Sequence, residues 1–187
     1  GIACQQGNRQ ICPWICPADI TYNRATVAHL HVAERARGAF NVVSTSTRAE
    51  RAAGVALICR QMNAQGLTSV HQASTGSAAF TAYQDAREAG DLTFRMHALA
   101  SGGSFPSLNG GGIRTGFGDE WLRIGAVKYV ADGSASERTM AMSTAYAGRP
   151  DDFGIMTMTQ EQVHEVVEEA HRSGWQVAIH ANGDVTI

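Results

Sequence analysis

The chain lacks the sequence features that mark membrane, nucleic-acid-binding and disordered proteins. No apolar run approaches the roughly 20 residues that a membrane-spanning helix needs, so we expect no membrane segment. The formal net charge of -2 provides no basic surface for nucleic acid. Hydrophobic residues make up 44% and charged residues 17% of the 187 residues, which is typical of a globular domain with its own core.

Motifs of three common enzyme classes are also missing. No G-x-G-x-x-G directly follows a predicted strand, and no G-x-x-x-x-G-K-[ST] phosphate loop occurs. The G-x-S-x-G turn that carries a serine nucleophile is absent as well. These absences argue against a nucleotide-binding domain and against serine-based hydrolysis.

Cysteine is scarce, and three of the four cysteines lie in the first sixteen residues. Cys12 and Cys16 have three residues between them, whereas common zinc and redox pairs have two, and no second pair follows at zinc-finger spacing. We therefore expect free thiols and a cytoplasmic location. Residues 1–44 show no strong periodicity, and we predict an irregular N-terminal segment or insertion there.

From about residue 45, amphipathic helices that end in Gly alternate with short apolar strands. Capping-box patterns at 47–50 and 159–162 predict helix starts, and Gly66, Gly90 and Gly174 predict helix ends. We predict strands at 67–72, 92–99, 126–132 and 175–180, a Gly-rich loop at 101–118 and a short helical turn at 119–124. This alternation predicts parallel strands with crossover helices, in either a (β/α)8 barrel or a doubly wound open sheet.

In both architectures, chemistry takes place at the carboxyl ends of the strands. The polar residues predicted there are His71, His97, Lys128, Asp132, His180 and Asp184. Lys128 is unusual because it lies inside the apolar run 126–130. A buried lysine must be paired, neutral or directed into a cavity, and desolvation lowers its pKa. The alternative is a lysine that faces solvent on an edge strand.

His180 ends the last predicted strand, and Asn182, Gly183 and Asp184 provide a turn directly after it. An imidazole at this position can serve as a metal ligand or as a general base. The alternative is a histidine that is merely hydrogen-bonded in the core.

Two motifs in this order carry a resemblance to a known family. The first is K-x-x-x-D-G-S at 128–134 and the second is H-A-x-G-D at 180–184, with a capped helix between them. Together with the strand at 66–71, they resemble amidohydrolase family 3, the metal-dependent hydrolases of the YtcJ type, over about residues 47–187. The resemblance implies an α/β fold over 45–187, a partial (β/α)8 TIM barrel with roughly strands two to five and their helices.

The family implies a metal-dependent hydrolase of carbon–nitrogen bonds of the amide, non-peptide type, with a small-molecule substrate. One or two divalent metals, expected to be zinc, would activate a water and polarise the carbonyl. By resemblance, Lys128 is carbamylated and His180 is the fifth-strand ligand, so both bind metal. Asp132 and Asp184 would support the ligands or order loops. His71 would lie at the barrel mouth, near substrate.

The sequence departs from the family pattern in several places. His29 and His31 form the only His-x-His pair and lack the usual lead-in, so we expect the family's pair upstream of Gly1. Gln72 stands where relatives often have Asp, and the sixth-strand His and eighth-strand Asp would follow Ile187. We therefore expect a piece of a longer chain that is inactive alone and self-associates through exposed barrel edges. A non-catalytic α/β module that binds a small ligand remains the alternative.

Overall fold

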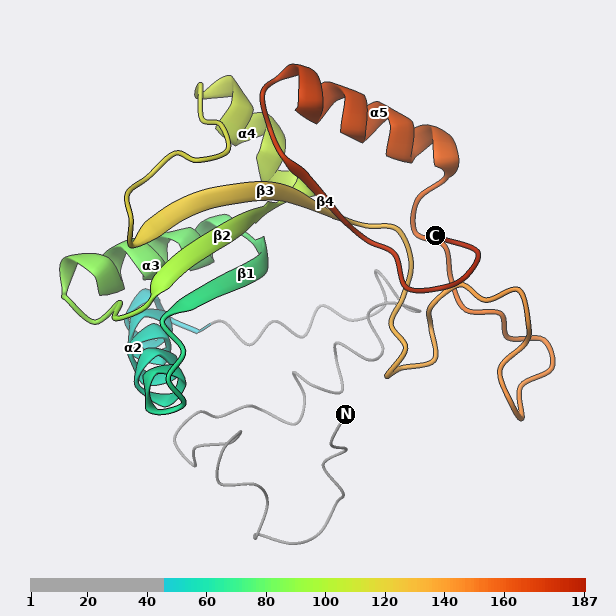
Figure 1. Ribbon diagram of the computed structural model, residues 1–187, viewed down its shortest axis with the longest axis horizontal. Helices are drawn as coiled ribbons and strands as arrows, with labels where there is room; N and C mark the ends of the chain where they lie inside the picture. Colours follow the sequence, from blue (N-terminus) through green and yellow to red (C-terminus); the bar gives the residue numbers. More distant parts are fainter. Residues whose placement is uncertain (1–45) are drawn as a thin grey trace, which may run out of the picture.

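The computed structural model describes residues 46–187, which form one parallel sheet with helices between its strands (Figure 1). The strands are β1 (Ser69–Thr75), β2 (Arg95–Ser101), β3 (Leu122–Val130) and β4 (Val177–His180). The helices are α2 (Arg48–Ala64), α3 (Ser77–Glu88), the short η1 (Gly102–Ser104), α4 (Phe105–Gly110) and α5 (Gln160–Arg172). The strand order β1-β2-β3-β4 never reverses within these residues. This order is that of a partial barrel, whereas a doubly wound sheet contains a reversal.

Local sequence signals explain where the two main capped helices begin. The hydroxyl of Thr47 accepts the backbone N–H of Glu50, and the hydroxyl of Thr159 accepts that of Gln162. The side chains of Glu50 and Gln162 accept the backbone N–H of their threonines in return, so both predicted capping boxes are confirmed. None of the helices within residues 46–187 has the length and apolarity needed to cross a bilayer.

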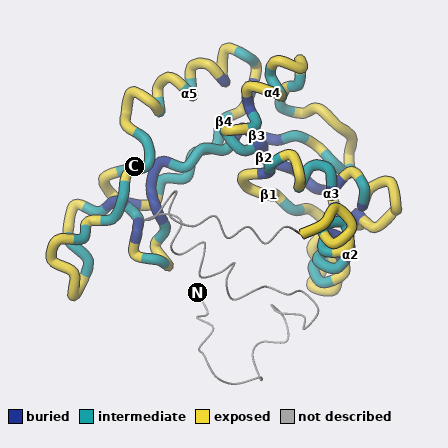
Figure 2. The backbone as a smooth tube through the Cα atoms, turned by 180° about the vertical axis from the view of Figure 1, so that it is seen from behind, coloured by how far each residue is buried: buried dark blue, intermediate teal, exposed yellow. Residues whose placement is uncertain are grey.

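The described helices cover only one face of the sheet. On β2, Met96, Ala98 and Ala100 are buried against helix side chains, whereas the alternate residues on the opposite face are exposed or partly buried. Figure 2 shows the contrast between the largely exposed β1 and the buried segments of β2. One core cluster contains Phe94 and packs β1 and β2 against α2 and α3. A second cluster contains Phe105, Val127 and Trp175 and packs the centre of the sheet under α4 and α5.

All four predicted strands are present, but their boundaries are shifted by two to four residues, except for the end of β4 at His180. The helical turn predicted at 119–124 is wrong, because β3 already begins at Leu122. Gly125 interrupts the apolar pattern of β3 and conceals its continuity in the sequence. A Cβ at Gly125 would lie 2.9 Å from Cδ2 of His97, so the neighbouring imidazole occupies that space. At the other edge, β1 extends beyond the predicted end at residue 72 to Thr75.

The predicted Gly-rich loop at 101–118 contains more structure than expected. It starts as the end of β2 and continues through η1 and α4. Phe105 and the partly buried Leu108 of α4 contact the second core cluster, so this short helix is fixed to the sheet by packing. The segment therefore lies against the carboxyl end of β2 as an ordered wall.

Candidate functional site

The carboxyl ends of β3 and β4 bring Lys128 and His180 to the same face of the sheet. In the strand register Lys128 lies opposite Ala178, and Val130 lies opposite His180. His180 is therefore diagonal to Lys128, two residues further along the neighbouring strand. With a strand spacing of about 4.8 Å and a rise of about 3.3 Å per residue, their Cα atoms are separated by roughly 8 Å. Two side chains at this separation can reach one shared ligand.

Lys128 is half-buried and has no acidic partner among the described residues. Its Nζ donates a hydrogen bond to the carbonyl oxygen of Tyr129, at 2.7 Å. Desolvation lowers the pKa of the Lys128 amine from its ordinary value, because burial disfavours the charged form. The lysine thus does not occupy a solvated edge strand, since β4 pairs alongside it. Burial thus makes the charged form of this amine less favourable than it is in water.

The imidazole of His180 is held by one of its two nitrogens. Its Nε2 lies 2.7 Å from the carbonyl oxygen of Gly133, and this contact requires Nε2 to carry the proton and donate. The neutral ring then has its lone pair on Nδ1, for which no described residue provides a hydrogen bond. A histidine fixed through one nitrogen by a carbonyl is the usual arrangement for a metal ligand that binds through the other.

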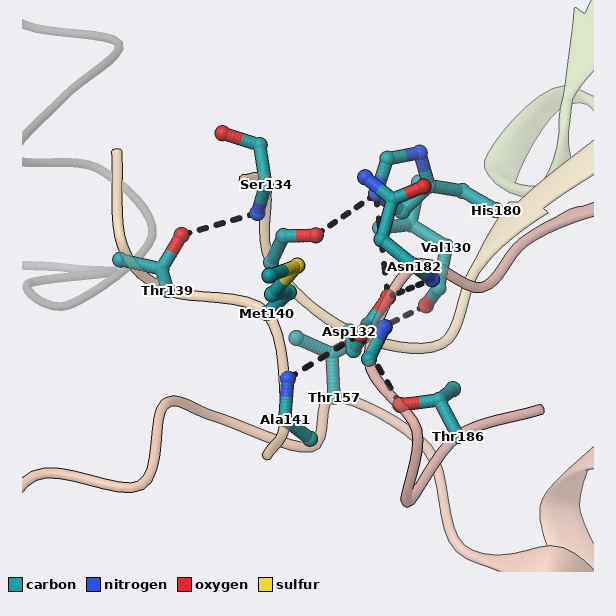
Figure 3. Close-up of polar contacts among 12 residues, drawn as sticks. Val130, Asp132, Ser134, Thr139, Met140, Ala141, Thr157, His180, Asn182 and Thr186 are labelled. Carbon is teal, nitrogen blue, oxygen red and sulfur yellow. Dashed lines mark hydrogen bonds and ion pairs between the residues drawn. The ribbon is translucent and has the colours of Figure 1, made fainter. Parts of the chain in front are cut away.

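Asp132 is the hub of the loops that follow β3 and β4 (Figure 3). Its carboxylate is fully buried and accepts the backbone N–H groups of Ala141, Asn182 and Gly183 and the hydroxyl of Thr186, at 2.7 to 3.1 Å. Burial acts to raise the pKa of Asp132, but these hydrogen bonds outweigh it and lower the pKa. Asp132 is therefore an anion whose oxygens are saturated by the protein, and it orders both loops.

The glycines of the two motifs are explained by close backbone approach. A Cβ at Gly133 would lie 2.3 Å from the carbonyl oxygen of Thr139, and a Cβ at Gly183 would lie 1.8 Å from that of Ala141. Both distances are far below any real contact, so only glycine fits. The D-G-S and N-G-D sequences are thus two halves of one packed structure, joined through Asp132.

Asp184 is exposed and lies at the outer side of this structure. Its carboxylate accepts the backbone N–H and the hydroxyl of Ser143, and these bonds lower the pKa of Asp184. Asp184 therefore links the two loops, and its hydrogen bonds among the described residues go to Ser143 and not to His180.

His71 lies away from Lys128 and His180. It is paired in register with His97, which is paired with Arg123, whereas Lys128 is paired with Ser101 at the carboxyl end of β2. The predicted position of His71 at the strand mouth is wrong, because β1 continues to Thr75. His71 and His97 pack edge to face, with ring centroids 4.7 Å apart.

These imidazoles line a hollow of about 370 Å³ toward the amino ends of the strands, together with Arg95, Glu120 and Arg123. Desolvation lowers the pKa of His97, and the neighbouring His71 and Arg123 lower it further. The hollow is separated from the candidate site by the remaining length of the sheet.

Two serines near the carboxyl ends of the strands were not predicted as site residues. Ser101 is the register neighbour of Lys128, and its hydroxyl lies 2.8 Å from that of Ser104. Ser74, at the end of β1, has a φ of 62°, a left-handed conformation that is uncommon for a residue with a side chain. Ser101 could have been found by extending the predicted strand to the S-G-G-S sequence, but no sequence signal marks Ser74.

The described residues fit two ligands of a metal centre and do not complete one. No group of three or more His, Cys, Asp or Glu side chains within residues 46–187 is placed to hold a metal ion. A catalytic zinc site has three protein ligands and an open position. Lys128 and the free Nδ1 of His180 would provide two donors of such a site. His29, His31, Cys12 and Cys16 lie outside the described residues.

Known proteins share both the sequence pattern and the fold of this chain. The sequence profile of the amidohydrolase family matches residues 22–187. Over 126 residues the chain is 27% identical to a putative amidohydrolase, YtcJ, of Bacillus subtilis (strain 168), covering 65% of this chain and 23% of that protein. Over 65 residues it is 38% identical to Protein LONG AFTER FAR-RED 3 of Arabidopsis thaliana, covering 35% of this chain and 11% of that protein.

Two solved structures, both described as uncharacterized metal-dependent hydrolases, have the same fold. The protein from Pyrococcus furiosus superposes with a TM-score of 0.70 at 26% identity, over 87% of this chain and 33% of that chain. The protein from Pyrococcus horikoshii OT3 superposes with a TM-score of 0.69 at 27% identity, over 75% of this chain and 29% of that chain. The chain thus spans between 11% and 33% of the length of these relatives. Because the family profile matches most of its residues, the chain belongs to the amidohydrolase family.

Proposed function

We propose that this chain is part of the barrel of a metal-dependent hydrolase that cleaves carbon–nitrogen bonds of the amide, non-peptide type in a small molecule. The observation that supports this proposal best is that Lys128 and His180 lie diagonally opposite each other on one face of the sheet, at the carboxyl ends of adjacent strands. One is a half-buried amine without a carboxylate partner, and the other is an imidazole whose Nε2 is already fixed by the Gly133 carbonyl. Both side chains thus have a donor atom to offer to a divalent metal, which we take to be zinc.

Bound there, such a metal would supply a water of lowered pKa and a Lewis acid for the substrate carbonyl. Residues of this chain prepare Lys128 and His180 for binding a metal. Burial favours the neutral form of the Lys128 amine, which is the form that adds to carbon dioxide. The nitrogen lone pair of the neutral amine forms the new C–N bond as one C=O π bond of carbon dioxide breaks, and the nitrogen then loses one proton to water. The product is an anionic carbamate, which attracts a cation that the protonated ammonium would repel. The Gly133 carbonyl fixes the proton of His180 on Nε2 and keeps Nδ1 available.

Metal loading in the full-length protein tests the proposal. We expect about one or two zinc ions per chain in the wild type, and strongly reduced zinc in Lys128→Ala and His180→Ala. His164→Ala is the matched control, because His164 lies on α5 and contacts only Gln160 among the described hydrogen-bond partners. Undiminished zinc and turnover in Lys128→Ala would exclude the proposed ligand set.

Two further measurements test the finer parts of the proposal. Protein prepared with ¹³C-bicarbonate should show a carbamate carbon resonance that is absent in Lys128→Ala. The reading frame that carries this chain should also encode an upstream His-x-His pair and a downstream His and Asp, since the chain covers at most a third of the solved relatives.

We also propose that residues 1–187 are inactive alone, because two ligands cannot build a preorganised site. Within the described residues β1 and β4 are unpaired edges, and unpaired edges favour self-association. Gel filtration and an amidase assay of residues 1–187 test both points, and a monodisperse monomer with amidase activity would refute them.

A further inference from the structure

The buried Asp132 does more than join two loops, because the residues directly before and after it in the sequence both form hydrogen bonds with His180. Ala131, directly before Asp132, donates its backbone N–H to the carbonyl of His180 at 2.9 Å. Gly133, directly after Asp132, accepts the Nε2 proton of the imidazole at 2.7 Å. Oδ1 of Asp132 itself lies 3.7 Å from Nε2. The backbone and the ring of His180 are thus both held by the segment 131–133.

The same carboxylate fixes the chain on the other side of His180. Oδ1 accepts the N–H of Asn182, and Oδ2 accepts the N–H of Gly183 and the hydroxyl of Thr186. Oδ2 also accepts the N–H of Ala141. Any movement of the carboxylate therefore displaces the Gly133 carbonyl and the residues after His180 together, so the ring orientation depends on Asp132.

Burying an ionised carboxylate is costly, and the four donors around Asp132 offset that cost because both oxygens accept hydrogen bonds. The same carboxylate also places its negative charge beside an imidazole. His180 is the residue of opposite potential charge that the structure places beside this carboxylate. A negative charge 3.7 Å from Nε2 stabilises the proton on that nitrogen and leaves the lone pair on Nδ1.

We propose that Asp132 is a positioning residue that fixes the ring orientation and the Nε2–H tautomer of His180, so that Nδ1 is the atom offered to a divalent cation. The identity of the cation rests on the proposed function, whereas the control of the tautomer does not. Asp184 links the same two loops through hydrogen bonds with Ser143, and none of its described hydrogen bonds goes to His180, so loop tethering and ring positioning can be tested separately.

The tautomer is tested in metal-free, full-length protein labelled with ¹⁵N-histidine, with the His180 signals assigned by their loss in His180→Gln. Long-range ¹H–¹⁵N correlation should show a fixed Nε2–H tautomer in the wild type. In Asp132→Asn the side chain has a single acceptor oxygen and no negative charge, so it cannot accept all the hydrogen bonds that the two carboxylate oxygens accept. We therefore expect a mixed or reversed tautomer of His180. Ser143→Ala, which loosens the same two loops, should keep the wild-type pattern.

Affinity for Zn²⁺ alone, measured by competition with a chromophoric chelator, provides the second readout. We expect Asp132→Asn to bind Zn²⁺ about 10–100-fold more weakly, the usual effect of removing a partner behind a metal ligand. Ser143→Ala should stay within about twofold of the wild type, as for other surface substitutions. Thr186→Val removes one hydrogen bond to Oδ2 and should weaken binding in the same direction, but less.

The outcomes separate this proposal from the proposed function. A wild-type tautomer in Asp132→Asn, or an equal change in Ser143→Ala, would overturn the positioning role. If Asp132→Asn does not fold, Thr186→Val decides, because a Zn²⁺ affinity identical to that of the wild type would equally overturn the positioning role. If the wild type binds no Zn²⁺, the proposed function fails, and the tautomer measurement still tests Asp132.

Discussion

Replacing Gly183 by alanine should unfold the candidate site. The new Cβ would lie 1.8 Å from the carbonyl oxygen of Ala141 and within 2.6 Å of its backbone nitrogen and carbon. Since these are backbone atoms, the two loops must move apart by more than 1 Å to reach an ordinary contact of about 3 Å or more. That movement breaks the hydrogen bonds from the N–H groups of Gly183 and Ala141 to the Asp132 carboxylate.

Each hydrogen bond to a charged group contributes about 1.5–3 kcal/mol, so the loss of two should lower the free energy of unfolding by roughly 3–6 kcal/mol. At about 2–4 °C per kcal/mol for a domain of this size, the Tm should fall by roughly 6–24 °C. Urea unfolding followed by circular dichroism measures the change. Gly103→Ala is the matched control, because a Cβ there meets nothing within 4 Å and should be neutral or slightly stabilising. A Gly183→Ala protein within about 0.5 kcal/mol of the wild type would refute the close-packing argument.

Three other substitutions test separate parts of the structure. Lys128→Met should raise the free energy of unfolding of metal-free protein by about 1 kcal/mol, because it removes a desolvated amine from an apolar strand; an unchanged or lower value in urea would contradict this. Phe94→Ala, at a side chain only 1% exposed, should cost about 3–5 kcal/mol in the same assay, and a loss below 1 kcal/mol would contradict the packing of the first core cluster. The backbone N–H groups of Leu122 and Trp121 lower the pKa of Asp119, so its contribution to stability is present above the unfolded value of about 3.9 and is lost as the pH falls through the folded pKa. Asp119→Asn should therefore weaken the dependence of Tm on pH below about 4. An unchanged fall of Tm at acidic pH would contradict the stabilising role of the two hydrogen bonds to Asp119.

The sequence was sufficient for features that depend on neighbouring residues. The capping boxes at Thr47 and Thr159 depend on contacts three residues apart, and both were predicted correctly. The parallel order of the strands followed from the alternation with helices. Strand boundaries were less accessible. β1 ends in polar residues up to Thr75 that carry no apolar pattern, and Gly125 divides the pattern of β3.

The candidate site was only partly accessible, because its geometry depends on distant contacts. The position of Lys128 in a paired, half-buried strand could be inferred from its apolar neighbours. Nothing in the sequence indicates that the Gly133 carbonyl fixes His180, or that Asp132 gathers donors from two loops. The same limit explains His71, whose depth in the sheet depends on the register with β2 and not on its own neighbours.

The Asp132 hub also has a consequence for the order in which the chain folds. Its hydrogen bonds to Asn182, Gly183 and Thr186 span 50, 51 and 54 residues of sequence, whereas the one to Ala141 spans nine. Contacts over such separations carry a high loop-closure entropy and form slowly. The carboxylate therefore receives most of its partners only after α5 and β4 have docked on β3. During synthesis on the ribosome, the Asp132 carboxylate in the loop after β3 therefore lacks most of its hydrogen-bond donors until residues 182–186 have emerged.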